Sequence, residues 1–372
     1  MFKVINKSKQ SNARTGVVHT QHGSIKTPCF LPDATRASIR SLTTDDLSRL
    51  GLQSMVVNTY HLFLQPGISR IKKFKGVHNF MNYKGPLVSD SGGYQVFSLV
   101  YRNRNMGKIQ NSGVTFKSPY DGKEHVLTPK KSIQIQFDMG TDLMVCFDDV
   151  PPHDIGSKGM EKSIEHTIAW AKICKKEFDL QIKKRKLKNN PPMLFGVIQG
   201  GIDKKLRKKC ATALLEIGFD GYGFGARPVD DEGNLLGNIL DYTARLIPDD
   251  KLRFNLGMGT PSDILQSVKM GWDLFDCVIP TREARHGRLY INKGKSFSYE
   301  TVTITNSRFA KDLKPINALS KLPELREYTK SYLHHLFRTK EPLSIRLATL
   351  NNLEFYMDLM SQIRKEIKSG KL

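Results

Sequence analysis

The feature of this sequence that most restricts its fold is the alternation of short apolar segments with longer amphipathic ones. Apolar runs of strand length, each ending in polar or glycine-rich residues, cover 55–60, 86–93, 142–150, 193–201, 220–225, 253–259 and 274–281. Segments with helical periodicity lie between most of them, including 161–178, 204–218 and 262–271. Strands that alternate with helices form parallel sheets covered on both faces. We therefore predict an α/β fold, and this number of units favours a (β/α)8 TIM barrel over an open sheet.

The two ends of the chain depart from this rhythm. Residues 17–30 alternate in polarity and turn at His22 and Gly23, which predicts an N-terminal hairpin that closes the floor of the barrel. Beyond residue 288 the sequence predicts a second hairpin over 290–304 and a mostly helical stretch over 325–368. We expect a barrel domain over 1–288 that holds the catalytic site. An appended subdomain over 289–372 is expected to pack on the barrel and complete it.

Composition indicates the class of partner. The formal net charge is +22, and such a surplus favours a polyanion, because neutralising phosphates releases condensed counterions. Single lysine-rich runs, such as 183–188 and 204–209, are also typical of solvated helix faces. The five cysteines form no C-x-x-C pair, no stretch is apolar enough to span a membrane, and the N-terminus lacks the features of a signal peptide. A cytoplasmic protein without a membrane partner is expected.

Polar residues occur where several apolar runs end, namely Asp90, Asp148, Asp149, Gln199 and Asp276. Active sites of (β/α)8 barrels lie at the carboxyl ends of the strands, so these residues predict one pocket. Two carboxylates on opposite walls, without a metal-ligand cluster, suit substitution at a glycosidic carbon, where one is the nucleophile and the other the acid/base. If Asp276 attacks as the anion, the arginines that follow it would keep its pKa low or ordinary. The same arginines could bind the phosphates that flank the target sugar.

The segment 89–97 predicts the other wall of this pocket. Gly92 and Gly93 allow close approach of a flat ligand, and Tyr94 offers a stacking face. Asp148 and Gln199 carry acceptors and donors that match the Watson–Crick edge of a purine. The residues therefore indicate glycosyl transfer on a nucleic acid whose target base is unstacked.

Five motifs carry a resemblance to a known family: VSDSGGYQVFSL, FGVIQGG, GFDGYGFG, GMGTPSDI and FDCVIPTREARHG. Together with the segment around SYLHHLFRTKEPL, the chain resembles the bacterial tRNA-guanine transglycosylases over nearly its whole length. The resemblance implies a pentosyltransferase of queuosine tRNA modification. Such an enzyme exchanges guanine at the anticodon wobble position for a deazaguanine, either the prequeuosine base or queuine, through a covalent enzyme–RNA intermediate.

The resemblance also assigns expected roles. Asp276 matches the nucleophile and Asp90 the acid/base. Base binding is expected from Asp90, Ser91, Gly92, Gly93, Tyr94, Asp148, Gln199, Gly225 and Ala226. Contacts with the tRNA anticodon loop are expected from Gly257, Met258, Gly259, Thr260, Pro261, Ser262, Asp263, Thr281, Arg282, Glu283, Ala284 and Arg285. Family members commonly form homodimers, so a homodimer is a further expectation that the residues alone do not decide.

The chain departs from the family at its zinc site. The family carries Cys-x-Cys-x-x-Cys and a later histidine, and the matching positions here are Ser320, Leu322, Leu325 and Asn351. Leucines cannot bind a metal, and a closed zinc site serves folding rather than chemistry. We therefore expect no metal cofactor, with an apolar core in place of the ion.

The base pocket also departs from the family. Ala226 takes the position of a glycine, and Arg227 either lies at the pocket mouth or points to solvent. Val150 occurs where bacterial members usually have cysteine and queuine-using relatives have valine. The overall bacterial pattern nevertheless favours the small aminomethyl precursor over queuine. Two rival functions are a DNA-modifying transglycosylase and a non-catalytic RNA-binding paralogue, although the second should have lost its carboxylates.

Overall fold

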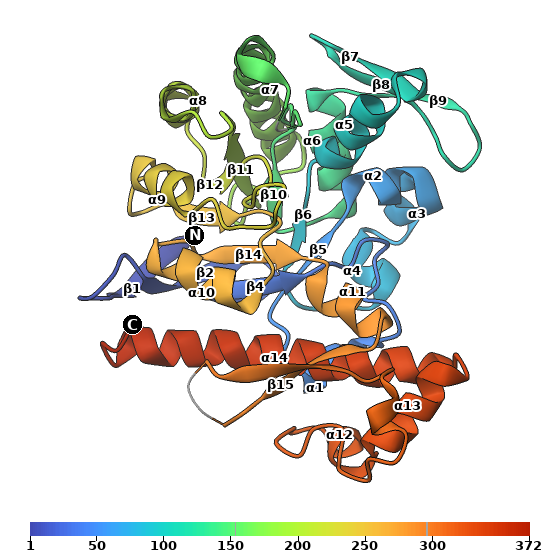
Figure 1. Ribbon diagram of the computed structural model, residues 1–372. Helices are drawn as coiled ribbons and strands as arrows, with labels where there is room; N and C mark the ends of the chain where they lie inside the picture. The colour runs from blue at the N-terminus through green and yellow to red at the C-terminus, as the bar shows by residue number, and fades with distance from the viewer. Residues whose placement is uncertain (153, 295–296) are drawn as a thin grey trace.

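A closed eight-stranded parallel barrel forms the centre of the protein, in a computed structural model that describes residues 1–152, 154–294 and 297–372 (Figure 1). Its strands are β4 (Cys29–Pro32), β5 (Met55–Val57), β6 (Leu87–Ser89), β10 (Leu143–Val145), β11 (Met193–Ile198), β12 (Gly221–Phe224), β13 (Leu252–Asn255) and β14 (Leu274–Cys277). From β5 to β14 each strand pairs with the next strand of the barrel, and β14 pairs with β4. The last seam, between β4 and β5, is closed by a bridge from Asp33 to Val56. The predicted (β/α)8 barrel is confirmed.

Helices connect the strands around the outside of the barrel. They are α1 (Thr44–Arg49), α2 (Thr59–Leu62), α3 (Ile68–Lys73), α4 (Val77–Met81), α5 (Gly93–Arg102), α6 (Pro129–Met139), α7 (Gly156–Lys184), α8 (Lys204–Ile217), α9 (Gly237–Leu246), α10 (Pro261–Lys269) and α11 (Ile279–Arg285). One small sheet interrupts the pattern between α5 and α6, and the sequence analysis did not predict it. It consists of β7 (Gly107–Gln110), β8 (Gly113–Lys117) and β9 (Glu124–Leu127).

Two apolar layers hold the barrel together, and they alternate along most of its strands. One layer gathers residues from strands all around the sheet, so it fills the interior. Its members are Cys29, Leu31, Val56, Val88, Leu143, Val145, Met193, Phe195, Val197, Leu252, Phe254 and Leu274, together with Val18 and Ile25. The residues between them, such as Phe30, Val57 and Phe275, join the outer layer under the helices. The inward side therefore recurs at every second residue, which fixes the direction of the next side chain beyond each strand.

The N-terminal residues close one end of the barrel. Strands β1 (Phe2–Lys7), β2 (Arg14–Thr20) and β3 (Gly23–Thr27) form an antiparallel sheet, with a turn at the predicted position. Val18 on β2 and Ile25 on β3 belong to the interior layer, so this sheet is the floor. The predicted N-terminal hairpin is confirmed, and the opposite end of the barrel, where the strands finish, stays open for a site.

The C-terminal segment packs along the outside of the barrel. It contains the antiparallel pair β15 (Arg288–Asn292) and β16 (Tyr299–Thr303), then α12 (Pro323–Glu327), α13 (Lys330–Arg338) and the long α14 (Pro342–Lys368). The hairpin and helices were predicted. Helix α14 lies against β4 and α11 (Figure 1), and its Tyr356 ring packs 4.6 Å from that of Phe30. Within the described residues, no helix is both long and apolar enough to cross a membrane.

Candidate active site

Polar side chains form the layer directly above the apolar interior of the barrel. Asp33, Asn58, Asp90, Gln199 and Asp276 each follow an interior residue by two positions. Because inward side chains recur with a period of two, these five residues point toward the open end of the barrel. Three of them, Asp90, Gln199 and Asp276, were predicted from the sequence. Asp33 and Asn58 were missed, although they end the same inward rows.

Asp90 lies at the end of β6 and is held by three donors. The backbone N–H groups of Thr59 and Gly92 donate to Oδ1 over 2.7 and 3.2 Å, and the amide of Asn58 donates to Oδ2. Burial nevertheless raises the pKa of Asp90 to about 7, although the Thr59 and Gly92 N–H groups lower it, and the nearby charge of Asp276 adds to the increase. A carboxyl with this pKa exchanges a proton readily near neutral pH.

Asp276 ends β14, and the backbone N–H of Gly257 donates to its Oδ1 over 3.1 Å. Burial raises its pKa to about 6, and this N–H partly offsets the increase. The expectation that arginines keep this pKa low or ordinary is wrong, because burial dominates. Arg282, Arg285 and Arg288 lie on or after α11, where Arg282 and Arg288 are exposed and contact Glu283. Near pH 6.5 an ionised Asp276 and a protonated Asp90 coexist, which is the pair that glycosidic substitution requires.

Asp148 and Gln199 form a buried pair in the same pocket. Gln199 donates from Nε2 to Asp148 Oδ2 over 2.7 Å. Burial raises the pKa of Asp148 to about 7, against the bond from Gln199. The Gln199 Oε1 atom is buried and accepts no hydrogen bond from the described residues, which leaves it free to accept one from a ligand.

Asp149 does not belong to the pocket, contrary to the prediction from strand ends. Its carboxylate contacts His166 Nδ1 at 2.8 Å and accepts from the hydroxyl of Tyr101 at 3.3 Å. These partners belong to α7 and α5, outside the barrel. Both residues lie beyond the end of β10, and their contacts place Asp148 on the ligand side while Asp149 anchors helices.

The loop after β12 approaches Gln199 very closely. A Cβ atom on Gly225 would lie 2.5 Å from the Gln199 amide, so only glycine fits there. Ala226 has a φ of +80°, a left-handed conformation that strains an alanine. Sequence analysis missed Arg207, which is buried and donates to the carbonyl groups of Ile198, Gly201 and Gly225 over 2.7 to 3.0 Å. The lysine-rich run 204–209 thus contains a residue, Arg207, whose hydrogen bonds hold together the backbone segments that line the pocket.

The mouth of the pocket is formed by the start of α5. Gly93 packs so closely on the backbone of Asp148 that its Cβ would lie 3.1 Å from that carbonyl oxygen. Ser91 is buried, Gly92 has a φ of +77°, and Tyr94 is about half exposed. A cavity of about 330 Å³ next to α5 is lined by Tyr94, Val150 and Arg227, among others, whereas Asp90, Asp148 and Asp276 are not among its lining residues. Arg227 lines this cavity, is about half exposed and contacts the exposed Asp231 at 3.5 Å.

The two segments expected to hold RNA flank Asp276 and are tied to α14. Residues 257–263 run from β13 into α10, which Thr260 caps through the N–H of Asp263. Tyr356 donates its hydroxyl to the Gly259 carbonyl over 2.5 Å, and Asn352 donates to the Pro280 carbonyl over 3.0 Å. On α11, Thr281 and Ala284 are buried while Arg282 is exposed. One face of α14 therefore fixes both segments.

Positive charges gather beside these segments. Burial lowers the pKa of Arg285, and the charges of Arg40 and Arg282 lower it further, which shows that the three guanidinium groups are close. Arg40 and the exposed Arg36 come from the loop after β4, which sequence analysis did not consider. Mutually repelling arginines on one face suit a phosphate backbone.

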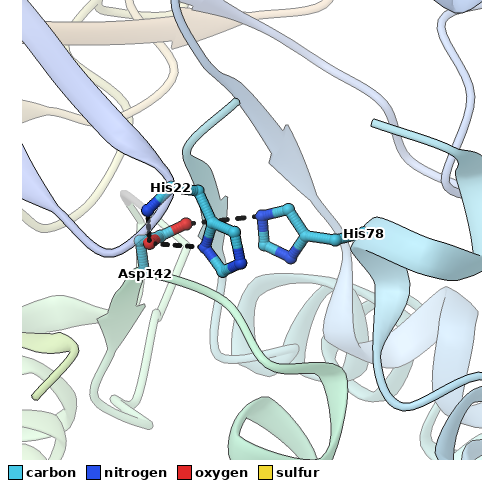
Figure 2. Close-up of side chains that lie close together, drawn as sticks. All are labelled: His22, His78 and Asp142. Carbon is cyan, nitrogen blue, oxygen red and sulfur yellow. Dashed lines mark hydrogen bonds and ion pairs between the residues drawn. The ribbon is translucent and has the colours of Figure 1, made fainter. Parts of the chain in front are cut away.

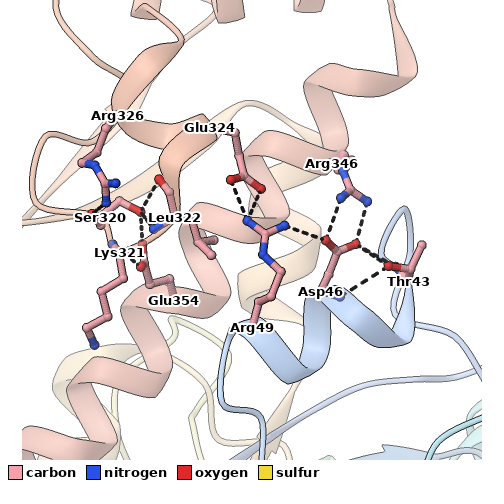
Figure 3. Close-up of polar contacts among 10 residues, drawn as sticks. All are labelled: Thr43, Asp46, Arg49, Ser320, Lys321, Leu322, Glu324, Arg326, Arg346 and Glu354. Carbon is pink, nitrogen blue, oxygen red and sulfur yellow. Dashed lines mark hydrogen bonds and ion pairs between the residues drawn. The ribbon is translucent and has the colours of Figure 1, made fainter.

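The positions that match the family's zinc ligands do not fit a metal ion. Leu322 and Leu325 are buried in the apolar core and have no ligand atom. Ser320 donates its hydroxyl to Glu354 over 2.5 Å, and Glu354 also accepts from the Lys321 N–H over 2.7 Å (Figure 3). Asn351 donates to the Tyr290 carbonyl over 3.0 Å and accepts from Asn317 over 3.1 Å. All four positions are occupied by packing or by hydrogen bonds.

Polar pairs join this region to the barrel. Arg346 on α14 binds both oxygens of Asp46 on α1, each over 2.6 Å, and Arg49 binds both oxygens of Glu324 over 2.7 Å (Figure 3). The Arg346–Asp46 pair is bidentate, which fixes its geometry, whereas Arg49 reaches Glu324 through Nη2 alone. The two pairs orient α12 and α14 against α1.

One cluster with metal-ligating side chains occurs among the described residues, and it lies at the floor of the barrel. His22 Nδ1 and His78 Nε2 face the two oxygens of Asp142 at 2.9 and 3.5 Å (Figure 2). The imidazole rings stack with centroids 3.6 Å apart, so an ion could not lie in both ring planes. The backbone N–H groups of Leu87 and His22 also donate hydrogen bonds to the Asp142 carboxylate. These contacts tie the N-terminal hairpin to the barrel.

Comparison with known proteins identifies the family. The family model described as queuine tRNA-ribosyltransferase matches residues 8–372. Curated relatives with that name include those of Halothermothrix orenii, 39% identical over 100% of this chain and 94% of the relative, and of Staphylococcus aureus strain RF122, 38% identical over 100% and 93%. The relative from Francisella tularensis subsp. novicida is 39% identical over 98% of this chain and 94% of its own length. The chain therefore belongs to the queuine tRNA-ribosyltransferase family.

Proposed function

We propose that this protein is a tRNA-guanine transglycosylase, a pentosyltransferase that acts in queuosine modification of tRNA. The observation that carries the proposal is the pair of carboxyls at the open end of the barrel, Asp276 and Asp90, whose pKa values of about 6 and about 7 suit opposite roles. Membership of the family supports the same activity. With tRNA as its substrate, the enzyme would act in the cytoplasm.

The reaction proceeds in two displacements. The Asp276 carboxylate attacks C1′ of the target ribose, the bond from C1′ to the guanine nitrogen breaks, and Asp90 gives its proton to the leaving guanine. The incoming deazaguanine then loses a ring N–H proton to Asp90, and its nitrogen attacks C1′. The ester to Asp276 breaks, so both carboxyls return to their starting states.

Base recognition falls to the opposite wall. The free Oε1 of Gln199 accepts from a purine N–H, while Asp148 supports the Gln199 amide and faces the same edge. The backbone from Ser91 to Gly93, with Gly225 and Ala226, approaches the base closely, and the exposed Tyr94 stacks on it. The substituent of a deazaguanine would enter the cavity beside Val150 and Arg227. We favour the aminomethyl precursor over queuine as the incoming base.

The anticodon loop would lie over residues 257–263 and 281–285. Arg282 and Arg285, with Arg40 nearby, would contact its phosphates. Two rivals are disfavoured for different reasons. A non-catalytic RNA-binding paralogue would not need Asp90 and Asp276 brought to one pocket with distinct pKa values. A DNA-modifying transglycosylase shares the chemistry and differs in its polymer, which the exchange experiment below compares directly.

The segment 289–372 is proposed to fold without zinc and to complete the barrel domain 1–288. Its support is the set of contacts at Ser320, Leu322, Leu325 and Asn351, none of which leaves a metal site. Helix α14 packs on β4 and ties the RNA-holding segments in place. A homodimer, expected from the family, is the proposed assembly.

The central experiment is base exchange by purified enzyme with labelled guanine, using tRNA and a DNA hairpin of the same loop sequence. Parallel arms supply the aminomethyl base or queuine, followed by nucleoside analysis of the anticodon. The variant Asp276→Asn should lose both exchange and the denaturation-resistant enzyme–RNA adduct. Asp179→Asn, which changes an exposed aspartate on α7, is the matched control. Full exchange by Asp276→Asn would refute the mechanism. Exchange into the DNA hairpin but not into tRNA would refute the proposal that tRNA is the substrate.

A further inference from the structure

Asp33 is a third carboxyl at the open end of the barrel. Cys29 and Leu31 point into the barrel, so the next inward position along that row is Asp33. Its strand β4 pairs directly with β14, where Asp276 aligns with Leu31 and Cys277 with Pro32. On the other side, Asp33 bridges Val56 of β5, the strand before Asn58. Asp33 therefore lies on the strand next to the nucleophile, two residues beyond the position that aligns with Asp276.

The environment of Asp33 differs from that of the other pocket carboxyls. Asp90 has three donors, Asp276 has the Gly257 N–H and Asp148 has Gln199. None of the described residues donates a hydrogen bond to the Asp33 side chain, and no cation pairs with it. Burial raises its pKa well above the usual range, and the charges of Asp276 and Asp90 raise it further. The raised pKa favours the protonated form of this carboxyl, in which one oxygen donates a hydrogen bond and the other accepts.

The position of Asp276 limits which part of a nucleotide can reach Asp33. A nucleophile must lie about 3–3.5 Å from the carbon that it attacks, which is C1′. Neighbouring strands are about 4.8 Å apart and residues rise about 3.3 Å along a strand, so a side chain one strand away and two residues further on can reach the sugar substituents around C1′. The hydroxyl nearest to C1′ is the 2′-hydroxyl, and it both donates and accepts, as a neutral acid does. Hydrogen bonds to this hydroxyl strengthen in glycosidic transition states.

We propose that Asp33 is a positioning residue that binds the 2′-hydroxyl of the target nucleotide and makes the enzyme prefer ribose to deoxyribose at that nucleotide. This inference rests on the proposed function, because it takes Asp276 as the nucleophile. It assigns a sugar-specificity role to a residue that neither holds the base nor exchanges its proton.

The test compares two RNA hairpins that differ only in the 2′-hydroxyl of the target guanosine. We expect the wild-type enzyme to exchange guanine with a kcat/KM at least about tenfold higher on the ribose hairpin. Asp33→Ala should lower the ribose value to nearly that of the deoxyribose hairpin and leave the deoxyribose value within about twofold of wild type. Asp33→Asn keeps a donor and an acceptor in the same shape, so it should retain much of the preference.

A structural defect would give a different result. If Asp33 only supported the fold, Asp33→Ala would reduce both values equally and leave their ratio unchanged, and that outcome overturns the inference. A wild-type ratio near one also overturns it. Failure of the wild-type enzyme to exchange guanine in either hairpin overturns the proposed function instead, and the inference with it.

Discussion

The pKa values of Asp276 and Asp90 predict a narrow pH dependence for base exchange. The reactive form needs Asp276 ionised and Asp90 protonated. The pKa of Asp276 is about 6, so the nucleophile is lost as the pH falls below that value. The pKa of Asp90 is about 7, so the acid is lost as the pH rises above it. The profile of kcat/KM should therefore be bell-shaped, because it reports the ionisations of the free enzyme.

The size of the effect follows from these two values. At pH 6.5 about 60% of molecules carry both groups in the reactive state, whereas at pH 5 or pH 8 about 10% do. We expect kcat/KM to fall about sixfold from its maximum in each direction. The assay is labelled-guanine exchange into tRNA in buffers of constant ionic strength, because phosphate contacts depend on salt.

Two controls separate catalysis from other effects of pH. Thermal unfolding at each pH shows whether the fold persists, and RNA affinity at each pH shows whether binding changes. A profile that is flat from pH 5 to pH 8, or that keeps rising to pH 9, would refute the assignment of opposite protonation states to Asp276 and Asp90.

Three further predictions concern the pocket wall and the C-terminal segment. Gly225→Ala would force a Cβ atom against the Gln199 amide and should raise the KM for the base about tenfold. Gly237→Ala is the control, because its Cβ would have no contact closer than 3.4 Å and the KM should not change. Equal KM values for the two variants would contradict this prediction. Glu354→Ala leaves a buried hydroxyl and a backbone N–H without an acceptor, so urea unfolding should show a loss of about 3 kcal/mol, and Glu354→Gln should lose less. A chelator should leave the unfolding midpoint unchanged, and elemental analysis should find well below one zinc per chain; a stoichiometric ion would disprove the zinc-free segment.

Much of the pocket was predictable because it interrupts strongly apolar strands. Asp90, Gln199 and Asp276 are polar residues at the ends of runs that are otherwise buried, and parallel strands bring such ends to one edge. Asp33 and Asn58 obey the same rule but were missed. Strand β4 has only four residues between Pro28 and Asp33, and it follows the N-terminal hairpin so closely that the sequence reads as one unit.

Other features depend on tertiary contacts that a sequence does not show. Asp148 and Asp149 are neighbours, yet they face opposite sides of the barrel wall. Arg207 belongs to a lysine-rich run, but its own side chain turns inward to three carbonyl groups. The arginines after Asp276 are close in sequence and turn away on α11, so burial and not their charge sets the pKa of Asp276.

Helix α14 contacts two loops of the active site from outside the barrel. Asn352 and Tyr356 are one helical turn apart, and each grips a loop that borders the nucleophile. Because both contacts come from one helix, any change that shifts α14 would displace the two loops together, at a distance from the base pocket.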